Sequence, residues 1–234
     1  MISNIETQKR LLRLTGIIAI LVALLTTTAD EILQYSPQGG YATFAYVRNF
    51  AFWRPFSGHV LGVLAIPLLA VGYWHICHAL KLSGVKHTSL LFWIMAYGLA
   101  VGAAAHGSFA GLVVMAQMGT SSSLTTGQSY FLTYGGPLFA ATLLCYAITS
   151  IWYCIIILSR RTLYPKWMAF LSPFFISLAI ALFQVSNSVP VLGNILGPAW
   201  LNFAHVVFFA LSTCVLWNPK EERVSSTLQV NLNA

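Results

Sequence analysis

Charged side chains are scarce in this sequence. Only 7% of the 234 residues are Asp, Glu, Lys or Arg, and five carboxylates stand against twelve basic side chains. Soluble domains carry about 25% charged residues, so this shortage excludes an ordinary water-soluble chain. The hydrophobic share is 58% and the mean hydropathy is +0.76. The composition therefore indicates an integral membrane protein that crosses the bilayer several times.

The common catalytic motifs are also missing. The sequence has no glycine-rich phosphate loop, no G-x-S-x-G elbow and no H-E-x-x-H zinc motif. Its four cysteines, Cys77, Cys145, Cys154 and Cys214, lie in apolar runs without paired spacing, which is typical of buried small side chains and not of a disulfide framework. The basic residues that give the net charge of +7 flank these apolar runs, so we expect a lipid bilayer as partner and no nucleic acid.

The apolar runs predict an all-α fold, a single bundle of about six transmembrane helices of roughly 20 residues each. The expected spans cover about residues 14–33, 56–80, 89–115, 130–158, 167–185 and 197–217, within one transmembrane domain at 14–217. Residues 1–13 form a polar N-terminal segment and residues 218–234 a polar tail. Gly135-Gly136-Pro137 predicts a kink or a late start in the fourth span.

The basic residues predict the orientation of this bundle. With the N-terminus inside, ten of the twelve Lys and Arg residues fall in inner segments, and only Arg48 and Arg54 fall in outer loops. Because cytoplasmic loops carry the excess of Lys and Arg, both termini should be cytoplasmic. The aromatic stretch 36–55 should lie at the membrane surface, and Thr120–Gly127 should be a polar connector.

Small residues recur at helical spacing in the second and third spans. Such pairs let neighbouring helices approach closely, within one chain or between copies in a homo-oligomer. His106 shares a helix face with two of these glycines. The pairs are Gly58/Gly62, Gly98/Gly102 and Gly107/Gly111.

Polar side chains gather in the outer half of the expected bundle. Ionisable groups inside a membrane are costly and usually face the bundle interior or a water-filled cavity. Asn202 lies three residues before a histidine of the sixth span and therefore shares its face. The group comprises Asp30, Glu31, His59, His106, Asn202 and His205.

Several interpretations of this cluster remain open. Three histidines with an open position are typical of catalytic zinc, so His59, His106 and His205 are candidate metal ligands. Asp30 and Glu31 would then orient or deprotonate water, and Asn202 would bind substrate. A haem held between two of the histidines is a further possibility. Alternatively, each histidine forms a packing hydrogen bond, or the group lines a ligand cavity or proton pathway.

Two further histidines lie near the inner end of the second span. His75 and His78 stand three residues apart in Tyr73-Trp74-His75-Ile76-Cys77-His78. Tryptophan and histidine at this level are typical of an interfacial belt, which we favour over shared metal ligation.

The ordered segments Ala29-Asp30-Glu31, Gly72-Tyr-Trp-His75, Ala105-His106-Gly-Ser-Phe109 and Pro198-Ala-Trp-Leu-Asn202-Phe-Ala-His205 resemble a group of uncharacterised six-span bacterial membrane proteins. This resemblance implies a bacterial cytoplasmic membrane and no particular activity. The residue types are also similar to the ceramidase-like membrane hydrolases, in which three histidines and an aspartate hold zinc. Those hydrolases have seven spans and a His-x-x-x-His pair on the last span, and this sequence has neither feature.

The leading functional hypothesis is a metal-dependent hydrolase acting on a lipid-like substrate from the outer leaflet. The rival is a non-enzymatic protein that binds or transports a lipid-like or small-molecule ligand in the same outer cavity.

Overall fold

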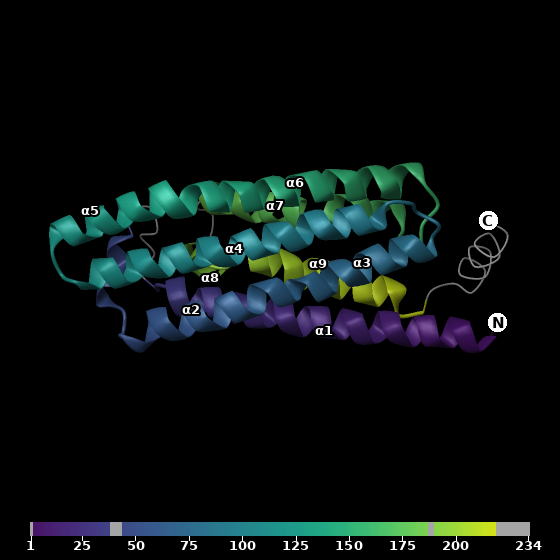
Figure 1. The fold of residues 1–234 in the computed structure, drawn as a ribbon, viewed down its shortest axis with the longest axis horizontal. Coiled ribbons are helices and arrows are strands. Elements are labelled where there is room, and N and C mark those ends of the chain that lie inside the picture. The colour runs from purple at the N-terminus through teal and green to yellow at the C-terminus, as the bar shows by residue number, and fades with distance from the viewer. Residues whose placement is uncertain (1, 38–43, 187–189, 219–234) are drawn as a thin grey trace.

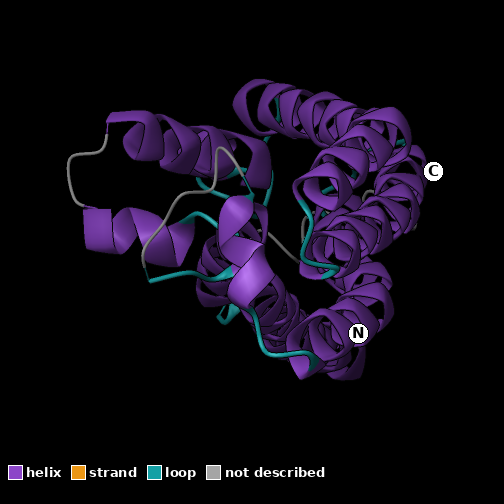
Figure 2. Ribbon diagram, turned by 90° about the vertical axis from the view of Figure 1, so that its left-hand side faces the viewer, coloured by secondary structure: helices purple, strands orange, loops and turns teal. Residues whose placement is uncertain are grey.

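The computed structural model describes residues 2–37, 44–186 and 190–218, and within these ranges the chain forms helices and loops without a strand (Figures 1 and 2). The prediction of an all-α fold is confirmed. The α-helices are α1 (Ile2–Gln34), α2 (Trp53–Ala65), α3 (Ala70–Leu82), α4 (Thr88–Gln117), α5 (Ser121–Tyr130), α6 (Gly136–Ser159), α7 (Pro173–Ser186), α8 (Pro190–Leu196) and α9 (Trp200–Leu216). Short turns of other helix types are η1 (Ala45–Asn49), η2 (Ile66–Leu69), η3 (Phe131–Gly135) and η4 (Lys166–Leu171).

Four helical stretches in the described ranges are long and apolar enough to cross a membrane. They are Glu6–Gln34, Trp53–Leu82, Thr88–Gln117 and Ser122–Ser159. The expected fifth and sixth spans correspond to shorter apolar helices, Pro173–Phe183 within α7 and Trp200–Leu216 in α9. The structure therefore supports a membrane protein with four candidate spans and leaves the six-span prediction unconfirmed.

Two segments outside the predicted spans are helical. Helix α1 begins at Ile2, so the polar start continues directly into the first apolar run. The expected connector after Thr120 is helix α5, so that prediction is wrong. The Thr120 hydroxyl accepts a hydrogen bond from the Ser123 N–H at 3.0 Å, and the Ser123 side chain accepts one from the Thr120 N–H at 3.2 Å. This reciprocal capping box satisfies the free N–H groups of the first turn and starts the helix.

Proline interrupts two of the long helical stretches. Pro67 lies in the η2 turn that separates α2 from α3. Pro137 follows a π-helical turn, in which the Gly136 N–H bonds to the Phe131 carbonyl five residues earlier. A proline has no N–H and clashes with the carbonyl four residues before it, so the backbone widens ahead of it. The kink predicted at Gly135-Gly136-Pro137 is present as this π turn, whereas the sequence argument missed the break at Pro67.

The helices run lengthwise in one elongated bundle (Figure 1). Helix α1 packs against α9 and α2, and α4 packs against α6. The Arg13 guanidinium donates to the Trp217 carbonyl and to Asn218 Oδ1, both at 2.8 Å, so the first turns of α1 lie beside the end of α9. The other end of α1 is capped by Arg54, which donates to the backbone carbonyls of Ile32 at 2.7 Å and Tyr35 at 2.8 Å. A cation at a helix C-terminus satisfies free carbonyls and complements the helix dipole.

The cysteines carry no disulfide. All four are free thiols: Cys77 and Cys145 are buried, Cys154 is half-buried and Cys214 is exposed. The prediction of buried small side chains is confirmed for the first two and wrong for Cys214, which lies on an outward face of α9.

Candidate functional site

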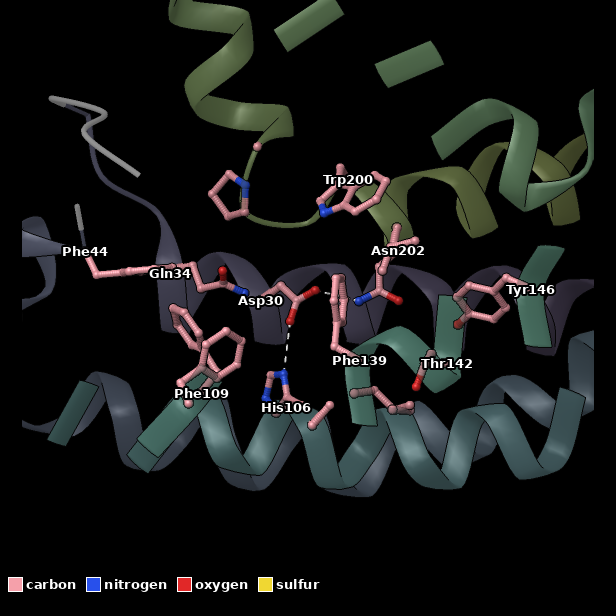
Figure 3. Close-up of a pocket in the computed structure, with 17 residues that line it drawn as sticks. Asp30, Gln34, Phe44, His106, Phe109, Phe139, Thr142, Tyr146, Trp200 and Asn202 are labelled. Atoms are coloured by element: carbon pink, nitrogen blue, oxygen red, sulfur yellow. Dashed lines mark hydrogen bonds and ion pairs between the residues drawn. The ribbon is translucent and has the colours of Figure 1, made fainter. Parts of the chain in front are cut away.

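A cavity of about 300 Å³ lies among α1, α4, α6 and the start of α9, in the half of the bundle where α1 ends (Figure 3). Three polar side chains of the predicted cluster line it, namely Asp30, His106 and Asn202. The rest of its wall is mostly apolar and aromatic. The other lining residues are Gln34, Phe44, Ile66, Gly102, Ala105, Phe109, Phe131, Phe139, Thr142, Tyr146, Gly197, Pro198, Trp200 and Leu201.

Asp30 is the centre of the polar part of this wall. Its Oδ1 lies 3.1 Å from His106 Nδ1, and its Oδ2 accepts a hydrogen bond from Asn202 Nδ2 at 2.7 Å. Figure 3 shows the two partners reaching the carboxyl from opposite sides, His106 from α4 and Asn202 from α9. Through this one carboxyl group, helix α1 is joined to α4 and to α9, which are distant from it in the sequence. A buried carboxyl needs such partners, since an unpaired one would be expensive away from water.

The hydrogen-bond directions show that Asp30 and His106 share one proton. His106 Nε2 lies 3.1 Å from the Gly58 carbonyl oxygen, which can only accept, so Nε2 carries a hydrogen. The opposite nitrogen, Nδ1, faces the Asp30 carboxyl. A hydrogen bond there requires a proton on Nδ1 or on Oδ1, and in both forms the pair has no net charge.

A missing side chain on α2 makes room for the His106 ring. A Cβ placed on Gly62 would overlap Nε2 of His106, and a Cβ on Gly58 would come within 2.8 Å of Leu33 Cβ. Gly58 therefore lets α1 approach α2, and Gly62 lets the imidazole of α4 enter. The predicted close packing at this glycine pair is confirmed: Gly58 makes a close contact with α1, and Gly62 makes one with the His106 ring.

The same holds for the first glycine pair of α4. A Cβ on Gly98 would lie 2.6 Å from Cys145 Cβ, and one on Gly102 would lie 3.2 Å from Thr142 Cγ2. Both neighbours belong to α6. The absence of side chains at these two positions therefore brings α4 and α6 together beside the cavity.

His205 is held in a different place by a closed set of contacts. Its Nδ1 lies 2.8 Å from the Leu201 carbonyl oxygen and its Nε2 lies 2.8 Å from the Tyr73 hydroxyl. Because the carbonyl only accepts, Nδ1 carries the hydrogen and Nε2 accepts from tyrosine. The ring has no exposed surface and packs beside Tyr146 and Phe209. Both nitrogens of His205 are therefore occupied.

His59 and Glu31 lie next to the Asp30–His106 pair without joining it. The His59 ring is parallel to the His106 ring, with centroids 6.3 Å apart, and its buried Nδ1 has no hydrogen-bond partner in the described ranges. Glu31 likewise has one buried carboxyl oxygen, Oε1, without such a partner there. Neither residue is among the described residues that line the cavity.

The predicted zinc set is not assembled as a group. Across residues 2–37, 44–186 and 190–218, no three His, Cys, Asp or Glu side chains are arranged to hold a metal ion. The alternative interpretation, that histidines bond to neighbouring helices, is confirmed for His106, which contacts α2, and for His205, which contacts α3.

The aromatic wall of the cavity was missed by the sequence argument. Phe44, Phe109 and Phe131 form edge-to-face contacts with centroid distances between 5.6 and 6.3 Å. Phe44 has φ 53° and ψ 8°, a left-handed conformation that a phenylalanine rarely adopts. Such strain is retained where the surroundings hold it in place, often beside functional sites. The aromatic density of residues 36–55 was a signal, although it was assigned to the membrane surface.

His75, which was expected in an interfacial belt, belongs instead to a buried hydrogen-bond network, so that interpretation is wrong for it. Its Nδ1 lies 3.1 Å from Thr15 Oγ1, whose hydroxyl donates to the Leu11 carbonyl. Its Nε2 lies 3.0 Å from Ser212 Oγ, which in turn contacts the Tyr164 hydroxyl at 2.8 Å. Burial raises the pKa of the Tyr164 phenol, so its hydroxyl keeps its proton and can donate to Ser212 in this series of hydrogen bonds.

One of the comparisons with known proteins finds a match. Residues 1–218 match the family described as "Family of unknown function (DUF6796)". The chain belongs to this family. No curated protein and no solved structure matches the chain. Function can therefore be inferred only from the residues of the site.

Proposed function

We propose that the protein binds a small, lipid-like molecule in the cavity beside Asp30, His106 and Asn202. The observation that carries this proposal is a carboxyl held from two opposite helices at the edge of a largely aromatic cavity. Ligand sites typically combine an apolar wall with a few convergent polar groups. Because the Asp30–His106 pair has no net charge, the best ligand has an uncharged hydrogen-bonding head group and an apolar body.

The metal-dependent hydrolase remains a prediction with less support. A zinc ion on His205 would have to displace the Tyr73 hydroxyl from Nε2, or the proton and carbonyl from Nδ1. His106 would likewise have to give up either Asp30 or the Gly58 carbonyl. Each exchange leaves a buried polar group without a partner, which costs about 1–3 kcal/mol. The same argument applies to a haem held between these two histidines.

The test is to identify what the purified protein retains. The full chain is purified without a metal-binding tag, chelated exhaustively, placed in nanodiscs of defined lipid, and extracted with organic solvent for mass spectrometry. We expect one amphipathic molecule per chain in the wild type. Asp30→Asn should retain much less of it, because the Asp30–His106 hydrogen bond loses its shared proton.

A matched pair of phenylalanine variants localises that molecule. Phe139→Ala removes part of the cavity wall, whereas Phe170→Ala removes a ring that is 60% exposed in η4, away from the cavity. Loss from Phe139→Ala with retention by Phe170→Ala supports the cavity. Equal retention by all variants would overturn the proposal. Stoichiometric zinc that disappears in both His106→Ala and His205→Ala would instead support the hydrolase, and iron with a Soret band would support haem.

We further propose that α7 and α9 complete six crossings of a bacterial cytoplasmic membrane, with both termini inside. Ten of twelve basic residues lie on one predicted side, and the start of α1 contacts the end of α9 through Arg13. Helix α9 has 17 residues, which at about 1.5 Å per residue reaches most of the apolar thickness. Reporter fusions test this: a fusion after Asn218 should be active only as a cytoplasmic reporter. Small-residue faces leave a homo-oligomer possible, which cross-linking of the same preparation measures.

A further inference from the structure

A second cavity lies at the opposite end of the bundle, at the turn that joins α3 to α4. Its volume is about 780 Å³, and it shares no lining residue with the cavity beside Asp30. Residues 83–87 form the turn, which lies at the same end of the bundle as the start of α1 (Figure 1). This cavity has no part in the function proposed above.

The side chains around it are of one charge type. Lys81 lies in the last turn of α3, Lys86 and His87 lie in the turn that follows, and His78 lies one helical turn before Lys81. No carboxylate lines the cavity in the part of the chain that the structure describes. Lys81 and Lys86 are both exposed. Two ammonium groups around one hollow create a positive potential that attracts an anion, and the imidazoles of His78 and His87 add polar groups beside them.

The start of α4 adds backbone donors to the same cavity. Thr88 and Ser89, the first two residues of this 30-residue helix, line the cavity. The residue before them, His87, has φ 61° and forms no side-chain cap. The first N–H groups of a helix have no partner within it, and the dipole makes this end positive. An uncapped helix start among basic side chains therefore forms a site for an oxyanion such as a phosphate.

The level of the cavity identifies the source of that phosphate. Both helices that flank it are candidate spans, Trp53–Leu82 and Thr88–Gln117, so the turn between them lies where the apolar thickness ends. Trp74 lines the cavity with its ring stacked on His78 at 4.8 Å and 6°. His78 is held in turn by Gln8, with Nε2 and Oε1 2.7 Å apart. Phe92 continues the cavity wall along α4.

We propose that this cavity binds the phosphate head group of an anionic phospholipid. The basic residues and the start of α4 bind the phosphate, and Trp74 and Phe92 contact the glycerol and upper acyl region. A lipid fits better than free phosphate, because the aromatic wall follows the polar group toward the apolar part of the spans. Basic pockets between transmembrane helices bind anionic head groups in this way.

The test compares two double variants of equal charge. Lys81→Gln with Lys86→Gln removes two charges from the cavity, and Arg160→Gln with Arg161→Gln removes two exposed charges from the turn after α6. The full chain is titrated with dioleoylphosphatidylglycerol and with dioleoylphosphatidylcholine, and bound lipid is measured by native mass spectrometry. With about 1 kcal/mol for each lysine, we expect the cavity variant to bind phosphatidylglycerol about 30-fold more weakly. The arginine variant should stay within about threefold of wild type, because neither arginine lines the cavity and exposed charges outside it are screened.

Each outcome decides the proposal. A wild-type preference for phosphatidylglycerol that only the lysine variant loses supports it. Equal losses in the two variants would show general attraction to anionic lipid and overturn it, and so would equal affinity for the two lipids. Inorganic phosphate is titrated in parallel. If phosphate alone binds at Lys81 and Lys86 and phosphatidylglycerol does not, the site takes a soluble phosphate and the lipid proposal is wrong. None of these results depends on the cavity beside Asp30.

Discussion

His106 and His205 show how differently two buried histidines of one bundle are used. His106 lies at the wall of a cavity, and its second nitrogen shares a proton with Asp30. His205 has no exposed surface, and both its nitrogens are bonded to groups that belong to the packing, the Tyr73 hydroxyl and the Leu201 carbonyl. The same side chain is thus part of an open site in one region and of a closed core in the other.

The difference lies in the partner and not in the depth of the histidine. A hydroxyl and a carbonyl together satisfy a neutral imidazole fully, and nothing more can bind without breaking them. A carboxyl opposite an imidazole keeps one mobile proton and remains able to exchange it with a ligand. We therefore expect changes in the closed region mainly to lower stability, and changes in the open region to alter ligand binding as well.

The largest effect should come from His205→Ala. Truncation leaves a hole in a fully buried site and removes the acceptor of the Tyr73 hydroxyl. Together these changes should lower the free energy of unfolding by roughly 3 kcal/mol, measured by denaturant titration in mixed micelles. A double variant, His205→Phe with Tyr73→Phe, fills the hole and removes the orphaned hydroxyl, so it should regain part of this loss. Unchanged stability of His205→Ala would show that the two regions do not differ.

Gly62→Ala should come next. The new methyl group would overlap His106 Nε2 and force the ring away from the Gly58 carbonyl, at a cost of roughly 2 kcal/mol. Gly193→Ala in α8 is the matched control, because a Cβ there meets nothing within 4 Å. Removing the obstructing ring with His106→Ala should make the Gly62→Ala change nearly neutral. Additive losses in that double variant would mean that the overlap is relieved elsewhere.

Asp30→Asn should have a smaller effect on stability. The exchange replaces the hydrogen bond between a carboxyl group and His106 with a weaker bond from a neutral amide, so about 1–2 kcal/mol should be lost in the same denaturant titration. His59→Gln serves as the control, because His59 lies next to the pair without a hydrogen bond to it. An equal loss in His59→Gln would show that the bond between Asp30 and His106 does not account for the effect.

The all-α fold and most of the polar residues of the candidate site could be predicted from the sequence, because composition and apolar runs indicate which segments lie in a membrane. It placed Asp30, His106 and Asn202 in one half of the bundle, and these do meet. It grouped His205 with them because depth along a helix can be estimated from the sequence, whereas the direction a side chain faces depends on how α9 is rotated against α3. No periodicity reports that rotation.

The smallest loss of stability should come from Asn202→Ala. This variant tests most directly whether the region around Asp30 is more open than the region around His205. This side chain donates to Asp30 Oδ2, at the wall of a cavity that water can enter. A water molecule can replace the lost donor nearly as well, so the change should cost about 1 kcal/mol or less in stability. Ligand retention should fall more than stability does, because an exchangeable water does not fix the orientation of the carboxyl. A stability loss as large as that of His205→Ala would mean that Asp30 is held as rigidly as the closed core, and the cavity would then be a packing defect and not a site.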